Sequence, residues 1–208
     1  MPLEGDALAA WLSARAGKLT ASRMADALDF RKDGKPGAAR IKLMHEILAE
    51  RLTTDSVRHY VTDAMQWGME KEAEAKAAYE AETGEFVSQA GFYDHPRIDN
   101  FGGTPDGLLD GGGLIETKCP TTTTFVAWKM ACVIPEEHKP QMLAQLAVTG
   151  RRWCEFVAFD PRIKNPRHRL FIRRFSPPPE EIAGIERAAE AFLAEVETAW
   201  EALAGAPA

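Results

Sequence analysis

The chain has 208 residues, of which 45% are apolar and 27% are charged, so it is long enough for one globular domain with an ordinary core. These values exclude a large multidomain assembly and a disordered or collagen-like chain. No apolar run reaches the roughly 20 residues of a membrane span, and the acidic N-terminus differs from a signal peptide. We therefore expect a cytoplasmic protein with no membrane partner. Its three cysteines, Cys119, Cys132 and Cys154, fit neither an even disulfide framework nor a paired zinc motif.

The net charge of −6 is unevenly distributed along the chain. Residues 151–174 hold eight lysines and arginines against Glu155 and Asp160, whereas residues 180–208 hold seven glutamates against Arg187. The acidic total therefore does not exclude an anionic partner, because binding depends on local charge. The basic segment predicts salt-dependent contacts with a nucleic-acid backbone.

The first part of the chain is predicted to be mainly helical. Apolar residues at helical spacing, hydroxyl caps and a glycine stop predict helices over residues 6–15, from about 20 to 28, over 41–52 and over 63–82. Between them, breakers and charges over residues 31–37 predict a loop.

Beyond residue 85 the pattern changes to short β-type runs with two more helices and a closing helix. The predicted strands are 86–88, 91–94, 101, 108–109, 114–118, 154–159 and 169–175, and the predicted helices are 124–133, 138–149 and an amphipathic one at about 180–203. Residues 1–208 are thus expected to form one α/β domain with a mixed central sheet flanked by helices.

The most informative segment is Asp106 to Lys118. Asp110 and three following glycines predict a turn between two antiparallel strands. Strand side chains alternate, so Glu116 and Lys118 share a face and the hairpin brings Asp106 beside them. Two carboxylates are hard oxygen ligands that suit Mg²⁺, with Mn²⁺ as a substitute, when substrate phosphate oxygens complete the coordination.

Such a site predicts metal-assisted hydrolysis of a phosphodiester bond. Lys118 would either orient the attacking water or stabilise the negative charge that builds on phosphorus. In the alternative interpretation, Asp106 caps a turn, and Glu116 and Lys118 form a cross-strand surface pair.

Pro105-Asp106 followed by Glu116-Thr117-Lys118 is the PD-(D/E)xK nuclease pattern, and its setting resembles the lambda exonuclease-like, YqaJ-type viral recombinase family. Further blocks resemble that family in the same order. They are Trp11 to Arg15 with Gly17 and Thr20-Ala21-Ser22, Trp67-Gly68 with Glu72, Ala144-Gln145, and Phe159-Asp160-Pro161-Arg162. One departure is Met142, which stands where the family often has an aromatic residue.

The resemblance implies a restriction-endonuclease-like core and a processive, Mg²⁺-dependent 5′→3′ exonuclease. It implies action on double-stranded DNA ends that carry a 5′-phosphate. Such an enzyme releases mononucleotides and leaves 3′ single-stranded tails for recombination. Relatives form a ring-shaped homotrimer, and a single-strand annealing protein is the partner that the family implies. A bacterial or prophage origin is expected.

The same resemblance assigns roles to individual residues. Asp106, Glu116 and the Thr117 carbonyl would bind the metal, and Lys118 would serve the water. Glu72 and Gln145 would complete the catalytic site. Arg15 would receive the terminal phosphate, with Ser22 in the same pocket.

Alternatives remain at this stage. Glu72 lies among other glutamates on a helix, where acids usually form a solvated face. The protein could be an endonuclease of the same fold, or a DNA-end binding module whose carboxylates are structural. Three scattered cysteines exclude a normal iron–sulfur cluster of the kind some related nucleases carry.

Overall fold

The structure, a computed structural model, describes residues 5–53 and 62–205. Residues 1–4 of the N-terminus considered above lie outside this range, and within it the side chains of residues 5–9, 64 and 65 are not described. Across the described residues, no helix is long and apolar enough to cross a bilayer.

Seven helices and seven strands, joined by short 3-10 turns, make up the described chain. The helices are α1 (Gly5–Arg15), α2 (Met24–Ala27), α3 (Ala38–Thr53), α4 (Asp63–Thr83), α5 (Thr122–Ala131), α6 (Lys139–Thr149) and α7 (Pro179–Ala204). The strands are β1 (Leu19–Thr20), β2 (Tyr93–Asp94), β3 (Phe101–Gly103), β4 (Gly107–Leu109), β5 (Gly113–Lys118), β6 (Trp153–Phe159) and β7 (Leu170–Phe175). The 3-10 turns are η1 (Ala21–Arg23), η2 (Asp110–Gly112), η3 (Glu136–His138) and η4 (Pro166–His168).

The long helices and the 106–118 hairpin are confirmed, with small shifts at their ends. Helix α5 begins earlier than expected because the Thr121 side chain accepts a hydrogen bond from the Thr124 amide and caps the helix there. The strand expected over 86–88 is wrong, since Ser88 forms an isolated bridge with Leu108. The helix expected from about residue 20 is instead strand β1, turn η1 and the short α2.

The α/β class is confirmed, but the strands form two sheets instead of one central sheet. The first has the order β1-β3-β2 and the second the order β4-β5-β6-β7, and both mix parallel and antiparallel pairs. The break falls between Gly103 and Gly107, where Pro105 has no N–H group to continue a strand ladder.

The four-stranded sheet is covered on both faces by helices. Along β5, Leu114 packs with Phe125 of α5 and with residues of α6, whereas Ile115 packs with Tyr79 of α4. The alternation of β5 therefore directs Glu116 and Lys118 toward the face that α6 covers, while Thr117 shares the face of Ile115.

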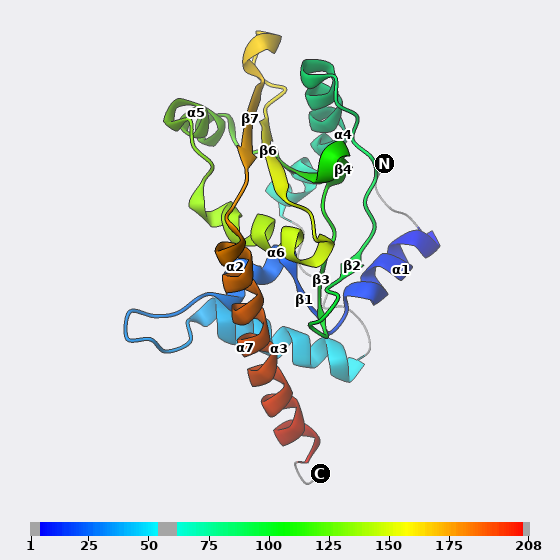
Figure 1. Cartoon of the computed structure of the whole chain (residues 1–208), viewed down its shortest axis with the longest axis vertical. Helices are drawn as coiled ribbons and strands as arrows, with labels where there is room; N and C mark the ends of the chain where they lie inside the picture. The colour runs from blue at the N-terminus through cyan, green and yellow to red at the C-terminus, as the bar shows by residue number, and fades with distance from the viewer. Residues whose placement is uncertain (1–4, 54–61, 206–208) are drawn as a thin grey trace.

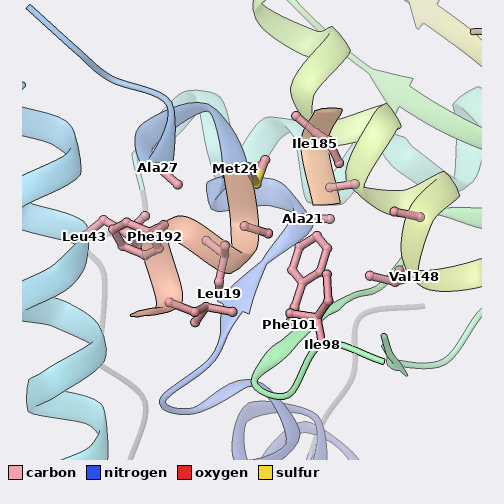
Figure 2. Close-up of a cluster of buried hydrophobic side chains, with 14 of the residues drawn as sticks. Leu19, Ala21, Met24, Ala27, Leu43, Ile98, Phe101, Val148, Ile185 and Phe192 are labelled. Atoms are coloured by element: carbon pink, nitrogen blue, oxygen red, sulfur yellow. The ribbon is translucent and has the colours of Figure 1, made fainter. Parts of the chain in front are cut away.

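The three-stranded sheet lies in a second core. Figure 2 shows Leu19 of β1 and Phe101 of β3 in one cluster with Leu43 of α3 and Phe192 of α7. All four side chains are fully buried. This core holds β1 and β3 together although they are about eighty residues apart in the sequence.

Helix α7 has the expected amphipathic character, with buried residues Ile185, Ala189, Phe192, Leu193 and Val196 on one side. Some of its glutamates form ion pairs with residues of other segments, so they do not form a continuous unpaired acidic surface. Glu186 pairs with His95 and Arg97, Glu195 with Arg40, and Glu197 with Arg51. The C-terminal end of α7 and the η4 tip between β6 and β7 lie at opposite ends of the long axis (Figure 1).

Candidate active site

The β4–β5 hairpin places the two predicted metal ligands side by side. Gly107 pairs with Ile115 in the antiparallel register, so Asp106 lies where the next cross-strand partner of Glu116 would be. The negative charge of Asp106 raises the pKa of Glu116, as expected for two neighbouring carboxylates. The hairpin thus joins residues that lie ten positions apart in the sequence.

Asp106 is held by the residue between Glu116 and Lys118. Its Oδ2 accepts hydrogen bonds from the Thr117 amide at 2.7 Å and from Thr117 Oγ1 at 2.6 Å. Its Oδ1 takes part in no hydrogen bond among the described residues. One carboxylate oxygen therefore orients the side chain, and the other is left for a ligand.

Glu116 is fully buried at the centre of the cluster. Its Oε2 accepts a hydrogen bond from Gln145 Nε2 at 2.6 Å, and its Oε1 accepts one from Lys118 Nζ at 2.5 Å. Burial, and then the charge of Asp106, raise the pKa of Glu116 to about 7, although Lys118 and Gln145 act in the opposite direction. A bound cation would favour the charged carboxylate.

Lys118 extends from the last residue of β5 into the same cluster. Its ammonium donates to Glu116 and, at 3.3 Å, to Gln141 Oε1. Burial lowers the pKa of Lys118, but the charges of Glu116 and Asp106 outweigh it, so the net shift is upward. The side chain is therefore a cation at neutral pH, with one of its three N–H donors left for substrate or water.

Gln141 was missed by the sequence analysis. It precedes Gln145 by four residues, so both lie on one face of α6, where Gln145 contacts Glu116 and Gln141 contacts Lys118. The signal that could have found it is this helical spacing from a residue already singled out.

Gln141→Leu is expected to lower kcat about fivefold with an unchanged KM, because it removes about 1 kcal/mol of hydrogen bonding to Lys118. Steady-state kinetics on linear duplex DNA would measure both constants. The control is Gln89→Leu, which alters an exposed glutamine in the loop before β2. A kcat equal to that of the control would show that Gln141 does not orient the lysine.

Glu72, on α4, forms no hydrogen bond or ion pair with this cluster among the described residues. Its carboxylate pairs with Lys76 one turn along the helix, and the described residues show no hydrogen bond from it to Asp106, Glu116 or Lys118. It does lie near the end of β5. The pKa of the Cys119 thiol is raised to about 11 by burial first and then by the charges of Asp106 and Glu72. The catalytic role of Glu72 stays a prediction.

The residues present suit a divalent cation that binds oxygen. Within the described residues, no group of three or more histidine, cysteine, aspartate or glutamate side chains could hold a metal ion, so a closed protein cage is absent. Two carboxylates are nevertheless what Mg²⁺ normally takes from a protein when water and phosphate oxygens fill the other positions. In addition, Gln145 Oε1 is buried without a hydrogen-bond partner among the described residues, in the same amide group whose Nε2 donates to Glu116.

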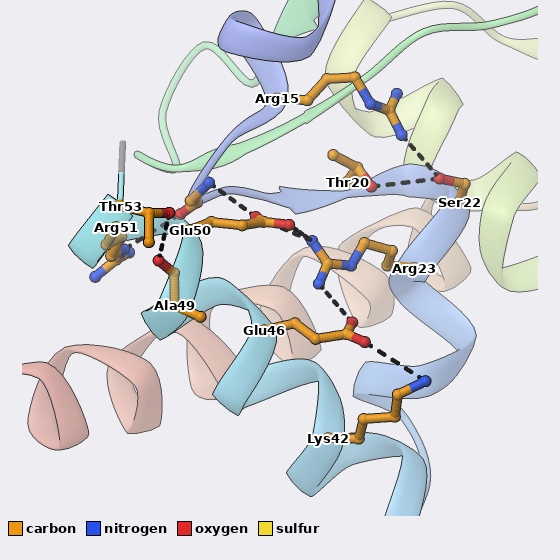
Figure 3. Close-up of polar contacts among 11 residues, drawn as sticks. Arg15, Thr20, Ser22, Arg23, Lys42, Glu46, Ala49, Glu50, Arg51 and Thr53 are labelled. Carbon is orange, nitrogen blue, oxygen red and sulfur yellow. Dashed lines mark hydrogen bonds and ion pairs between the residues drawn. The ribbon is translucent and has the colours of Figure 1, made fainter. Parts of the chain in front are cut away.

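The predicted phosphate pocket is a separate group of side chains beside β1. Arg15 Nη2 donates to Ser22 Oγ at 3.3 Å, and Ser22 Oγ lies 3.3 Å from Thr20 Oγ1 (Figure 3). Ser22 is exposed, whereas Arg15 is half-buried. Burial and the neighbouring Arg23 lower the pKa of Arg15 to about 10, so the guanidinium remains charged near neutral pH.

A clamp from α3 fixes the turn between Arg15 and β1. Glu50 Oε2 accepts from the Gly17 amide at 2.9 Å, and Arg51 Nε donates to the Gly17 carbonyl at 3.2 Å. Gly17 has a φ of 73°, and a Cβ there would lie 2.9 Å from Arg51 Cγ. Glu50 also pairs with Arg23, as Figure 3 shows. These contacts fix the turn that follows Arg15.

The basic segment 151–174 has a larger structural role than its charge suggested. Six of its eight cations donate to the chain's own carbonyl or carboxylate groups. They are Arg151, Arg152, Arg162, Arg169, Arg173 and Arg174. Arg162, for example, donates to buried Asp160 at 2.7 Å and to the Pro120 carbonyl at 2.5 Å. It thereby secures the segment that follows Lys118.

Fold and site together define a class of protein. An α/β domain that presents Asp106, Glu116 and Lys118 on a hairpin covered by helices has the PD-(D/E)xK-like fold of nucleases. The chain matches the YqaJ-like viral recombinase domain over residues 10–152, and it belongs to that family.

Solved structures agree with this assignment. The chain is 41% identical to LHK-Exo in complex with dAMP, with a TM-score of 0.85, covering 93% of this chain and 95% of that one. It is 42% identical to the alkaline exonuclease LHK-Exo from Laribacter hongkongensis, with a TM-score of 0.84 and the same coverage. A phage-related exonuclease from Haemophilus somnus 129PT, at 17% identity and a TM-score of 0.60 over 87% of this chain and 95% of that one, shares the fold. No curated protein matches the chain.

Proposed function

We propose that this nuclease is a 5′→3′ exonuclease that hydrolyses double-stranded DNA from its ends in the presence of Mg²⁺ or Mn²⁺. The observation that carries the proposal is the cluster of Asp106, Glu116, Lys118 and Gln145, in which a buried carboxylate contacts both a lysine and a glutamine. Its products would be mononucleotides and 3′ single-stranded tails. The dAMP bound to the related LHK-Exo, a deoxynucleoside monophosphate, supports a mononucleotide product.

The metal-binding residues of this proposal are Asp106 and Glu116, together with the Thr117 carbonyl. A divalent cation supplies polarisation of the scissile phosphate and a lower pKa for water. Glu116 provides negative charge in a buried setting, and Gln145 keeps that carboxylate oriented through the 2.6 Å hydrogen bond. Glu72 would add a further acid from α4.

Lys118 would stabilise the negative charge that develops on the phosphate oxygens. The upward shift of its pKa favours this role over that of a base, because the ammonium keeps its proton. Glu116 and Gln141 orient it from two sides, so that its remaining donor points in a fixed direction. An alternative role, in which the ammonium orients the attacking water, uses the same donor.

Arg15 and Ser22 would bind the terminal 5′-phosphate. A guanidinium and a hydroxyl that already contact each other offer charge-assisted donors to a phosphate oxygen. The exposed Ser22 marks the side that a DNA end would reach.

Arg15→Ala is expected to reduce the preference for 5′-phosphorylated over 5′-hydroxyl duplex ends about tenfold or more, because charge-assisted hydrogen bonds are worth ~1.5–3 kcal/mol. The measurement is digestion of linear duplexes with either end and strand-specific labels, in Mg²⁺ or in EDTA. The control is Arg187→Ala, an exposed arginine of α7. An unchanged preference would locate phosphate recognition elsewhere.

The same assay separates the competing functions. An endonuclease of this fold would cut closed circular DNA, whereas an exonuclease requires an end. A DNA-end binding module would release no nucleotides and would show no heat of Mg²⁺ binding in calorimetry. Either result would replace the proposed activity.

The proposal extends to assembly and partners. A homotrimeric ring would surround the duplex and make hydrolysis processive, and a single-strand annealing protein would receive the 3′ tails. Action in the cytoplasm of a bacterium, on bacterial or prophage DNA, suits this recombination role. Lys164 and Arg167 near the η4 tip are exposed cations suited to the DNA backbone.

A further inference from the structure

The phosphate pocket and the catalytic hairpin are joined by one side chain, Trp11 of α1. We propose that Trp11, through Thr104, sets the distance between the anchored 5′-phosphate and the bond that is cut, and thereby the length of the nucleotide released. The inference rests on the proposed exonuclease function and adds a specificity-determining position to it. Trp11 acts through Arg15 and Thr104, so it is a positioning residue.

Trp11 contacts both regions at once. Its indole Nε1 donates a hydrogen bond to Thr104 Oγ1 at 3.2 Å, and the Arg15 guanidinium carbon lies 4.2 Å from the centre of its ring. Thr104 precedes Asp106 by two residues. One rigid ring therefore spans from the residue that would hold the phosphate to the segment that carries a metal ligand.

A second contact fixes the other side of the pocket to the same segment. Strand β1 pairs in parallel with β3, with Thr20 opposite Gly102. At Gly103 a Cβ would lie 2.8 Å from the Cβ of Ala21, the neighbour of Ser22. The β1–β3 pairing fixes the register of Ser22 relative to Thr104, and the missing side chain at Gly103 allows the two segments to approach this closely.

The consequence concerns the products of hydrolysis. A strand anchored by its terminal phosphate presents to the metal the phosphodiester that lies at the matching distance along the backbone. A fixed distance selects one bond and one product length, whereas a variable distance lets bonds further along the strand react. The Trp11 bridge restricts this distance, because it links α1, which carries Arg15, to the segment that carries Asp106.

The test measures product length on 5′-phosphorylated linear duplex carrying an internal strand label. Trp11→Phe keeps a ring for Arg15 but removes the N–H donor, and Thr104→Val removes the acceptor at nearly constant shape. Each is expected to raise the fraction of di- and trinucleotides several-fold over the wild type, and the double variant should match the single ones, because all three lose one hydrogen bond. Trp11→Leu, which also removes the ring, should raise it further.

The control is Trp153→Phe, since Trp153 also lies under an arginine, Arg174, at 3.8 Å from the ring centre, in the sheet outside the pocket. It should release mononucleotides like the wild type. A merely structural role of Trp11 would lower the rate without changing product length. Mononucleotides alone from folded Trp11→Phe and Thr104→Val would therefore overturn the proposal, and Thr104→Val decides the matter if the Trp11 variants do not fold.

Failure of this inference is distinguishable from failure of the proposed function. If Arg15→Ala loses the preference for phosphorylated ends while the Trp11 and Thr104 variants keep mononucleotide products, the anchor is right and the bridge is wrong. If Arg15→Ala keeps the preference, the anchor itself is wrong, and the bridge proposal fails with it.

Discussion

Lys118→Ala is expected to lower kcat about 10³-fold, while the affinity for a DNA end remains within a few-fold of the wild type. The ammonium of Lys118 is the cation nearest to the buried Glu116 carboxylate, at 2.5 Å, and its remaining donor is free for the reacting phosphate. In the proposed function, DNA-end binding would depend on contacts spread over many cations, so the loss of this one should change affinity little.

The measurement combines single-turnover hydrolysis with end binding in Ca²⁺ or EDTA. Lys139→Ala is the matched control, because Lys139 is also on the α6 side of the site but pairs with Glu136 at the surface. Activity of Lys118→Ala close to that of the control would remove the lysine from the mechanism. A parallel loss of DNA binding would show that its charge serves affinity instead.

The sequence predicted the placement of most side chains of the candidate site because that site is local. Asp106, Glu116 and Lys118 lie on one hairpin, whose turn residues and strand alternation are visible in the sequence. The family resemblance assigned Gln145 to the site without naming its partner, and the structure places Gln145 Nε2 2.6 Å from Glu116 Oε2. Gln141 belongs to no motif, so only the structure revealed its contact with Lys118, one helical turn before Gln145 on α6.

What the sequence could not predict depends on long-range pairing. Strand β1 has only two residues, too few to show the alternating pattern of a strand. It forms because β3, about eighty residues later in the sequence, pairs with it. Likewise, the basic segment 151–174 was predicted from its charge to contact a nucleic-acid backbone, yet six of its seven arginines bond to carbonyls and carboxylates brought near by the fold. A run of basic residues in the sequence shows where positive charge is concentrated. Only the tertiary structure determines which acceptor each of these side chains binds.

The affinity for Mg²⁺ is expected to depend strongly on pH because of Glu116. The pKa of this carboxyl is raised to about 7, first by burial and then by Asp106, from an ordinary value near 4.5. Metal binding requires the charged form, so Mg²⁺ affinity should fall as pH drops below about 7, approaching tenfold per unit. Above that pH the affinity should level off. Isothermal titration calorimetry of the DNA-free protein with Mg²⁺ at pH 6, 7 and 8 would measure this dependence.

Whereas Mg²⁺ affinity should rise with pH, the free energy of unfolding of the metal-free protein should fall. Between about pH 4.5 and 7 the folded state binds the Glu116 proton more tightly than the unfolded state does, so the free energy of unfolding should fall as pH rises through this window. The fall would be up to about 3 kcal/mol. Mg²⁺ should then raise the melting temperature more at pH 8 than at pH 6, because it binds the charged carboxylate.

Glu116→Gln separates these effects. The amide cannot ionise, so this variant should lose at least about 10²-fold in activity and most of its Mg²⁺ affinity, while the part of the pH-dependent stability that Glu116 causes disappears. Glu155→Gln is the control, since Glu155 is a buried carboxylate of the neighbouring strand that pairs with Arg174 outside the cluster. Mg²⁺ affinity that stays constant from pH 6 to 8 in the wild type, or survives in Glu116→Gln, would contradict the assignment of Glu116 as a ligand.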